Sequence, residues 1–258
     1  MKLIDTHTHL YLKEFDDDID KVIERAEKEG VNKFFLPAID SSETSAMFRL
    51  EKKFPEKCFS MAALHPCSVK GNYKEELAIV EKLLEKRKFA AIGETGLDFY
   101  WDKTFTKQQY ESLTMQAGWA LQYNIPLVLH TRNAMQETVD VIKTYKGKGL
   151  TGIFHCFGGT LKNATDIIEM GFYLGIGGVI TYKNSGLTEI IKEIDLECIV
   201  LETDAPYLTP VPFRGKRNES SYLKYIVQKI AEIKNISREE VAEQTTKNAD
   251  KIFKEKTI

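Results

Sequence analysis

The chain has 258 residues, enough for one large α/β domain or two small ones with a substantial buried core. Hydrophobic residues make up 43% of the sequence and charged residues 29%, which are ordinary proportions for a soluble globular protein. The net charge of −2 excludes a general electrostatic attraction to nucleic acid, although bound divalent cations or a local basic patch can supply one.

The sequence favours a cytoplasmic protein with no membrane partner. The chain begins directly with a predicted strand, and no apolar run approaches the length of a membrane span. The four cysteines form no C-x-x-C pair and no zinc-ribbon spacing, which is typical of a reduced, intracellular chain. The oligomeric state is not fixed by the sequence, and a monomer is the default expectation.

Short β-rich runs alternate with longer amphipathic stretches along the chain. The predicted strands are residues 2–7, 33–38, 59–64, 89–94, 126–130, 152–155, 172–177 and 198–202. The predicted helices are residues 17–29, 75–87, 106–123, 135–145, 162–170, 187–194, 221–234 and 237–253. The strands are almost continuous apolar runs, which is the pattern of parallel strands covered on both faces.

This alternation predicts a barrel. Eight strand–helix units over about 250 residues match the repeat length of a (β/α)8 barrel. No Pro/Gly/Ser-rich linker or charge block marks a second domain, so we predict a single-domain (β/α)8 TIM barrel over residues 1–258. A doubly wound open sheet is the main alternative, but it would gather its ligands at one switch point rather than at strand ends along the whole chain.

All five histidines follow predicted strands: His7 and His9 the first, His65 the third, His130 the fifth and His155 the sixth. In a (β/α)8 barrel the C-terminal ends of the strands meet at one face, where catalytic groups collect. Histidines that serve only packing or the surface would fall anywhere, including the middle of helices. Their placement therefore predicts a metal centre at the strand ends.

The His-x-His pair is the first candidate chelate. Because side chains alternate along a strand, His7 and His9 point the same way, into the mouth of the barrel. Taken alone, such a pair can equally be a surface hydrogen-bonding pair. Asp5 lies on the same face, where it would accept a histidine N–H and fix the tautomer. The alternative is that Asp5 is a buried cap or turn carboxylate.

Two carboxylates complete the candidate centre. Glu94 ends the fourth predicted strand between glycines that would allow close backbone approach to a ligand, and its two oxygens suit it to bridge two cations. The alternative for Glu94 is a structural salt bridge. After the eighth strand, Asp204 would reach a metal or its water, while Glu202, one layer deeper, would orient a histidine from behind. Asp98 and Asp102 are expected to be loop or capping carboxylates.

Four imidazoles and two carboxylates are too many for one tetrahedral zinc with an open position. We predict two divalent cations, the first on His7, His9 and Asp204 and the second on His130 and His155, with Glu94 as the bridge. Two cations roughly 3.5–4 Å apart activate a bridging water for hydrolysis, so Glu94 and Asp204 are the candidate catalytic residues. Zinc, manganese, nickel and magnesium all remain open as the metal.

Five further residues are candidate substrate contacts: His65, Arg132, Arg214, Lys216 and Arg217. His65 could hydrogen-bond a phosphate or protonate a leaving group, but a structural histidine is the alternative. Arg132 could bind an anionic oxygen, and its alternative is a surface ion pair. The basic segment 214–217 follows the eighth strand at the face where this fold commonly holds phosphate; a solvated basic loop is the alternative.

Phe99, Tyr100 and Trp101 follow Glu94 in a predicted loop. Their rings could stack on nucleic-acid bases. A hydrophobic lid over the site is the alternative.

Taken together, these segments resemble a known family, the TatD-related metal-dependent deoxyribonucleases of the amidohydrolase superfamily, essentially from end to end. The matching segments are Asp5-Thr6-His7-Thr8-His9, Ala63-Leu64-His65-Pro66, Gly93-Glu94-Thr95-Gly96-Leu97-Asp98, His130-Thr131-Arg132, His155-Cys156-Phe157-Gly158-Gly159 and Glu202-Thr203-Asp204-Ala205-Pro206. The set is highly specific, although each segment alone is weak.

The resemblance implies a (β/α)8 barrel with up to two divalent metals on His7, His9, Glu94, His130, His155 and Asp204. It implies a 3′→5′ exonuclease acting on DNA, with single strands or 3′ ends as the substrate. Many other amidohydrolases carry a carbamylated lysine where Glu94 stands, so no such modification is needed here. No ligand position departs from the family pattern.

Two other classes of function stay open. The same metal centre could hydrolyse an amide or ester bond of a small molecule, as elsewhere in the superfamily. A non-catalytic metal-binding or scaffold protein is the third hypothesis, and the intact set of ligand residues argues against it.

Overall fold

The strands of the chain form two parallel groups. The computed structural model describes residues 1–253, so the last five residues of the predicted domain, 254–258, lie outside the described residues. The strands are β1 (Leu3–Asp5), β2 (Val31–Leu36), β3 (Cys58–Ser60), β4 (Ile92–Asp98), β5 (Leu127–Arg132), β6 (Gly152–Phe154), β7 (Phe172–Ile176) and β8 (Ile199–Leu201). Strands β1–β3 form one hydrogen-bonded group and β4–β8 the other.

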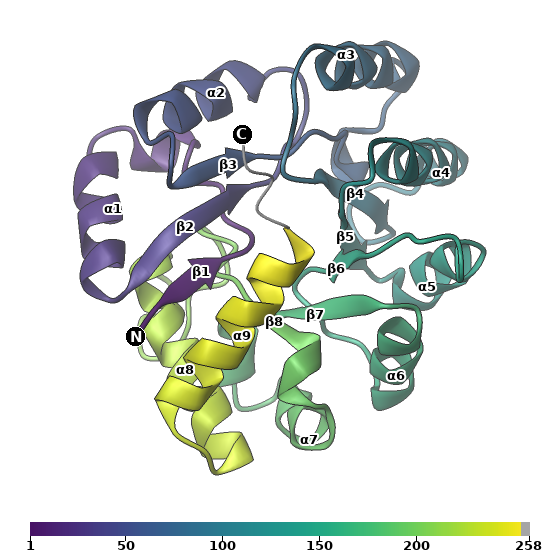
Figure 1. The fold of residues 1–258 in the computed structure, drawn as a ribbon. Helices are drawn as coiled ribbons and strands as arrows, with labels where there is room; N and C mark the ends of the chain where they lie inside the picture. The colour runs from purple at the N-terminus through teal and green to yellow at the C-terminus, as the bar shows by residue number, and fades with distance from the viewer. Residues whose placement is uncertain (254–258) are drawn as a thin grey trace.

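Short contacts close both gaps between the groups. A parallel bridge between Ala62 and Ile92 joins the chain after β3 to β4. The N–H of Thr6 donates to the carbonyl of Leu201 over 3.0 Å and joins β1 to β8. With helices around the outside (Figure 1), this is the predicted (β/α)8 barrel, and the predicted fold class is confirmed.

The helices are α1 (Ile19–Lys28), α2 (Thr44–Lys53), α3 (Tyr73–Lys86), α4 (Thr106–Tyr123), α5 (Met135–Lys143), α6 (Leu161–Glu169), α7 (Leu187–Glu193), α8 (Leu223–Lys234) and α9 (Arg238–Ile252). All eight predicted helices are present within a few residues of their expected ends. Sequence analysis missed α2, because its only fully buried apolar residues are Met47 and Leu50. No helix within residues 1–253 is long and apolar enough to cross a membrane.

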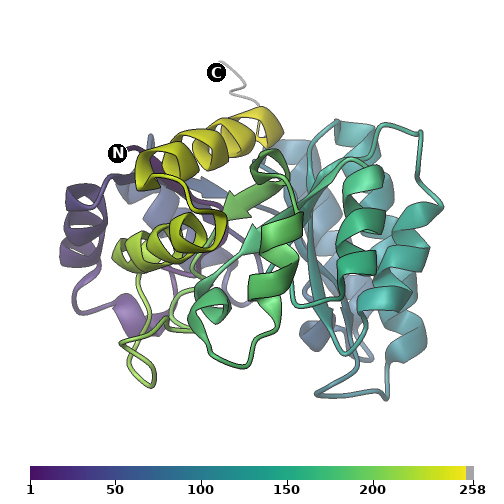
Figure 2. The same ribbon diagram turned by 90° about the horizontal axis from the view of Figure 1, so that it is seen from below.

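The interior of the barrel is closed at one end by α9. Inward-facing apolar side chains from seven strands or strand extensions pack with α9 in one cluster: Ile4, Phe35, Met61, Ala91, Val128, Ile153, Val200, Ala249 and Ile252. Figures 1 and 2 show α9, in yellow, lying across this end of the barrel. The larger apolar cluster fills the space between the strands and the outer helices. The opposite end, where the strands finish, is left for polar groups.

Strands β4 and β5 run further than the sequence predicts. They end at Asp98 and Arg132 rather than at residues 94 and 130, so Glu94 lies within a strand and not at its end. The glycine at position 96 has a φ of +144°, and a Cβ there would lie 2.1 Å from the carbonyl oxygen of His130. Glycine is required because β5 packs this closely, which corrects the expectation that a ligand makes the close approach.

Candidate metal centre

Glu94 lies at the centre of the polar end of the barrel, and one of its oxygens faces the first pair of histidines. Its Oε2 is 3.1 Å from Nε2 of His7 and 3.8 Å from Nε2 of His9. The Oδ1 of Asp204 is 3.7 Å and 3.5 Å from the same two nitrogens. Two imidazoles and two carboxylates therefore surround one point.

The other oxygen of Glu94 faces a second set of histidines. Its Oε1 is 2.7 Å from Nδ1 of His130, 3.2 Å from Nε2 of His155 and 3.4 Å from Nε2 of His65. Burial raises the pKa of Glu94, but the coulombic effect of His155 and the other histidines outweighs it and holds the pKa well below its ordinary value. Glu94 is therefore a buried carboxylate, which needs cationic partners on both sides.

The donor set fits divalent cations. Neither ring nitrogen of the fully buried His7 has a hydrogen-bond partner within residues 1–253, so a cation would satisfy a nitrogen that is otherwise orphaned. Burial lowers the pKa of His7, and the neighbouring His155 lowers it further, which keeps the imidazole in its neutral, ligating form. Three groups each have ligand atoms within 4.8 Å of one another: His7, His155 and Asp204; His7, His9 and Glu94; and His65, Glu94 and His130.

A tyrosine that sequence analysis missed holds His9. The hydroxyl of Tyr11 donates to the carbonyl of Pro37 over 2.6 Å and lies 3.0 Å from Nδ1 of His9. Because the tyrosine proton is used on Pro37, its oxygen accepts the Nδ1–H of His9. Nε2 of His9 then keeps its lone pair toward Glu94 and Asp204. The signal in the sequence was the alternation of residues 7, 9 and 11, although Tyr11 lies beyond the strand.

Asp98 was expected to be a loop or capping carboxylate, and it does more than that. Its Oδ1 accepts the backbone N–H groups of Tyr100 and Trp101, as a cap would. Its Oδ2 lies 2.8 Å from Nε2 of His130 and accepts the thiol of Cys67 over 3.4 Å. The capping role is confirmed, but the expectation was incomplete: β4 continues to residue 98, where side-chain alternation turns Asp98 to the same face as Glu94.

Asp5 does not orient an imidazole. Its oxygens accept the backbone N–H of Thr203 (2.9 Å), the hydroxyl groups of Thr203 and Ser220 (both 2.6 Å) and the backbone N–H of His7 (3.4 Å). Burial raises the pKa of Asp5 to about 7, against the lowering effect of these hydrogen bonds. The sequence-based role in fixing a tautomer was wrong. Asp5 is a buried turn carboxylate that ties β1 to the chain after β8.

Glu202 lies behind His155. Its Oε1 is 3.2 Å from Nδ1 of His155 and accepts the backbone N–H of Cys156 over 2.6 Å. Gly175 on the adjacent strand makes room for this carboxylate, because a Cβ there would lie 2.3 Å from Oε2 of Glu202. Burial lowers the pKa of His155, but Glu94 and Glu202 outweigh it and hold the pKa well above its ordinary value.

His65 has a defined tautomer. Its Nδ1 accepts the backbone N–H of Cys67 over 3.0 Å, so in a neutral ring the proton lies on Nε2. That N–H points toward Oε1 of Glu94, 3.4 Å away. The imidazole therefore presents a donor to the site and not a lone pair.

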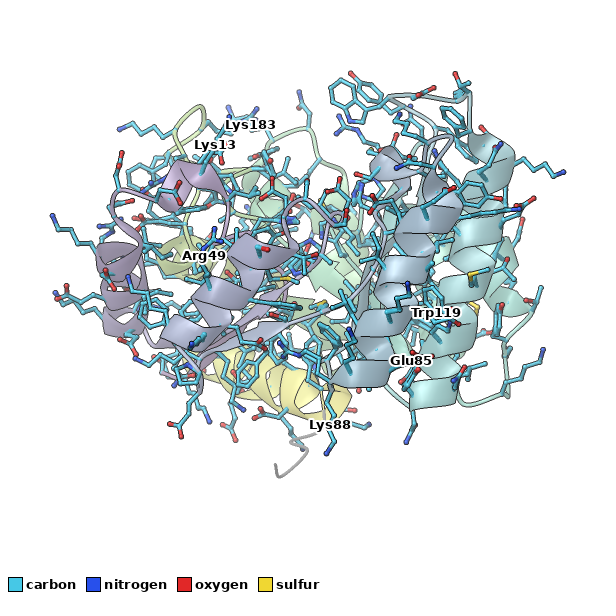
Figure 3. The ribbon with its side chains drawn as sticks, turned by 90° about the horizontal axis from the view of Figure 1, so that it is seen from above. Lys13, Arg49, Glu85, Lys88, Trp119 and Lys183 are labelled. Carbon is cyan, nitrogen blue, oxygen red and sulfur yellow. The ribbon has the colours of Figure 1, made fainter. Side chains whose placement is uncertain are left out.

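The predicted basic contacts separate into two kinds. Three lie over aromatic rings with no hydrogen bond to a carboxylate within residues 1–253: Arg132 at 4.2 Å from the centre of Tyr100, Arg214 at 3.9 Å from that of Tyr182, and Lys216 at 5.7 Å from that of Phe213. Arg217, which lies 4.7 Å from the centre of the Phe15 ring, also makes two hydrogen bonds to Asp18, at 2.8 and 2.9 Å, and one to the carbonyl of Glu14. We therefore leave Arg217 out of the substrate site. In Figure 3, Lys13 and Lys183 lie at the end of the barrel opposite α9.

Fold and site together define a metal-dependent hydrolase built on a (β/α)8 barrel. The sequence profile described as TatD related DNase matches residues 4–254, and the chain belongs to this family. An uncharacterized metal-dependent hydrolase from Bacillus subtilis, YabD, is 40% identical over 256 residues, which is 98% of this chain and 99% of that protein.

Two further relatives extend the comparison. A protein from Erwinia tasmaniensis named 3′-5′ ssDNA/RNA exonuclease TatD is 32% identical over 257 residues, covering 97% of this chain and 99% of its own length. The crystal structure of YjjV, a TatD homologue from Escherichia coli K12, superposes with a TM-score of 0.91 at 27% identity and covers 97% of both chains.

Proposed function

We propose that this hydrolase is a 3′→5′ exonuclease that cleaves phosphodiester bonds at the ends of single-stranded DNA. The observation that carries the proposal is that the two oxygens of Glu94 face different pairs of histidines. Its Oε2 faces His7 and His9, while its Oε1 faces His130 and His155. A carboxylate shared in this way suits a pair of divalent cations, and such pairs are recurrent in nucleases. The Erwinia relative is named as a 3′-5′ ssDNA/RNA exonuclease, which supports this choice of substrate.

In this proposal His7, His9 and Asp204 would hold one cation, His130 and His155 the other, and Glu94 both. The two cations, which could be zinc, manganese, nickel or magnesium, would activate a water and neutralise charge on the phosphodiester. Glu202 would keep His155 oriented by accepting the Nδ1–H of the imidazole on its carboxylate.

The protein's own proton carriers would flank the bond. Asp204, whose side chain is 14% exposed, would accept the proton of the attacking water. His65 would donate its Nε2–H to a phosphate oxygen, because its Nδ1 is already occupied by the Cys67 N–H. Arg132 and Arg214 would contribute positive charge to the phosphate path.

The test uses Glu94→Gln, with Glu85→Gln as the matched control. Glu85 is exposed and Figure 3 shows it on the outside of the barrel, far from the end that carries Lys13 and Lys183. Metal-stripped proteins would be assayed with magnesium, manganese or zinc on a 5′-labelled single-stranded oligonucleotide, and metal content would be measured separately. We expect a ladder shortened from the 3′ end, and a loss of more than about 100-fold in Glu94→Gln alone.

Two results would count against the proposal. Equal nuclease activity in Glu94→Gln and the wild type would show that the assigned centre does not carry the reaction. Turnover of carboxylic ester or amide substrates, with the oligonucleotide left intact, would favour the small-molecule hydrolase instead.

A further inference from the structure

The loops at the open end of the barrel hold aromatic rings out in water. Within residues 1–253, the large aromatic side chains that are exposed are Tyr100, Trp101 and Tyr207, with exposed fractions of 51%, 67% and 49%. Tyr100 and Trp101 follow β4, and Tyr207 follows β8. Phe99, which sequence analysis grouped with the first two, instead packs against the core beside Tyr110. The hydrophobic surface of the first loop is therefore confined to two residues.

Arg132 joins these two rings. The ring centres of Tyr100 and Trp101 are 4.8 Å apart and nearly perpendicular, at 86°. The guanidinium of Arg132, at the end of β5, lies 4.2 Å from the centre of the tyrosine ring and 5.3 Å from that of the tryptophan. No carboxylate within residues 1–253 forms an ion pair with Arg132, which leaves its N–H groups for a ligand. Together the three side chains form a cationic aromatic platform.

The platform is fixed to the candidate metal centre by one carboxylate. Asp98 accepts the N–H groups of Tyr100 and Trp101, at 2.9 and 3.0 Å, on Oδ1. Its Oδ2 lies 2.8 Å from Nε2 of His130, whose Nδ1 is 2.7 Å from Glu94. Asp98 therefore ties the backbone of the loop that carries the platform to His130 of the candidate centre.

The far end of the loop is also tied down. Asp102 pairs with Lys70 over 2.8 Å, and its Oδ1 accepts the N–H of Thr104. Both ends of the loop are therefore held while its two rings remain exposed. Exposure of a tryptophan and a tyrosine to water costs free energy that a stacked ligand would recover.

We propose that Tyr100, Trp101 and Arg132 form a stacking site for an unpaired nucleobase of the substrate strand. The inference rests on the proposed nuclease function and specifies which nucleic acid the site takes. Every base has a flat face, so stacking tolerates sequence, while a paired base inside a duplex has no face to offer. The guanidinium adds attraction for the adjacent phosphate. The platform therefore selects single strands without reading their sequence.

Two readouts test the platform, and one of them does not need catalysis. The chain has two tryptophans, and Trp119 is only 6% exposed, so a base stacked on Trp101 should quench the exposed part of the fluorescence. We expect a single-stranded deoxyoligonucleotide to quench the wild type, and Trp101→Phe to lose the quenching but keep binding. A blunt duplex of the same sequence should quench far less.

The second readout pairs a protein change with a substrate change. Trp101→Ala should lower kcat/KM on a single-stranded oligonucleotide by about 5- to 150-fold, the equivalent of one stacked base. For the wild type, oligonucleotides with abasic sites near the 3′ end should lose rate by a similar factor. Trp101→Ala acting on the abasic oligonucleotide should lower kcat/KM little more than either change does alone. Met115→Ala, which removes another exposed apolar side chain from α4, is the control and should leave the rate unchanged.

The outcomes separate the platform from the proposed function. Quenching without cleavage would overturn the nuclease and keep the platform. Cleavage with no quenching, with Trp101→Ala equal to Met115→Ala, would overturn the platform and keep the nuclease. The platform would also be overturned if the combined loss in kcat/KM equalled the product of the two separate fold-losses, from Trp101→Ala and from the abasic substrate. The tryptophan and the base would then act independently.

Discussion

A buried glutamine on α4 holds two segments of the candidate centre, and its removal should be costly. The Nε2 of Gln116 lies within hydrogen-bond distance of the carbonyl of Leu64 (3.1 Å), the hydroxyl of Thr95 (2.6 Å) and the hydroxyl of Ser112 (2.9 Å). Its Oε1 accepts the N–H of Leu64 over 2.8 Å. Leu64 immediately precedes the candidate substrate histidine, His65, and Thr95 immediately follows Glu94.

Gln116→Met keeps the length of the side chain and removes all of these hydrogen bonds. Leu64 is fully buried, so its N–H and its carbonyl would each be left without a partner. An unsatisfied buried group costs about 1–3 kcal/mol, so we expect a loss near 4 kcal/mol in the free energy of unfolding. For a chain of this size that corresponds to a fall in Tm of about 8–16 °C.

The assay is urea unfolding of metal-free protein followed by circular dichroism, with Gln228→Met as the matched control. Gln228 donates to Glu232 on the outer surface of α8, and its replacement should change stability by less than about 0.5 kcal/mol. A loss below about 1 kcal/mol in Gln116→Met would show that water replaces the glutamine. The argument that α4 fixes these two segments would then fail.

Two further predictions concern stability. Gly152→Ala should destabilise the protein by at least about 3 kcal/mol, because its Cβ would lie 1.9 Å from a β5 carbonyl oxygen. Gly118→Ala, on the open face of α4, should instead stabilise the protein by about 0.5–1 kcal/mol. Thermal unfolding of both variants checks this contrast. The hydrogen bond from Arg217 lowers the pKa of Asp18 to about 2, so this carboxylate stabilises the fold above about pH 4 and its contribution is lost as the pH falls toward 2. In urea unfolding from pH 5 to pH 2, Asp18→Asn should be less stable than the wild type at pH 5, and the difference should shrink with acid; a constant difference would contradict the assignment.

The fold and the set of candidate ligands were predictable for a geometric reason. The C-terminal ends of parallel barrel strands meet at one face, so chain order alone places the residues that follow them together. This brings His7, His130, His155 and Glu94 within a few ångströms of one another, although up to 148 positions separate them, from residue 7 to residue 155. Residue type then predicts metal binding, because imidazole and carboxylate are ligands for divalent cations.

Apart from the contact of Glu202 with His155, which was expected, the hydrogen-bond partners were not predictable, because they depend on packing and on exact strand ends. Asp5 accepts a hydrogen bond from Ser220, 215 positions away, and not from an imidazole. Arg217 donates to Asp18, 199 positions away, and no local pattern in the basic segment indicates this contact. The contact of Asp98 with His130 was missed because the predicted strand stopped four residues short. In each case the prediction failed on the hydrogen-bond partner of the side chain.

These partners also explain how the centre could be assembled before a cation binds. His9 is oriented through Nδ1 by Tyr11, and His155 through Nδ1 by Glu202. His130 is held through Nε2 by Asp98, so Nδ1 faces Glu94. Each of these rings has one nitrogen fixed by the fold and the other turned to the centre, which lowers the entropy cost of binding a cation.

His7 is the exception among the four. Its ring is held by stacking on His155, with centres 3.7 Å apart and planes at 13°, and no hydrogen bond within residues 1–253 orients it. A neutral His7 is compatible with this stack, whereas two protonated rings at that distance would repel each other. Stacking alone fixes the plane of the His7 ring less firmly than a hydrogen bond fixes the other three. If a cation binds as proposed, we therefore expect the His7 ring to gain more order from it than His9, His130 or His155.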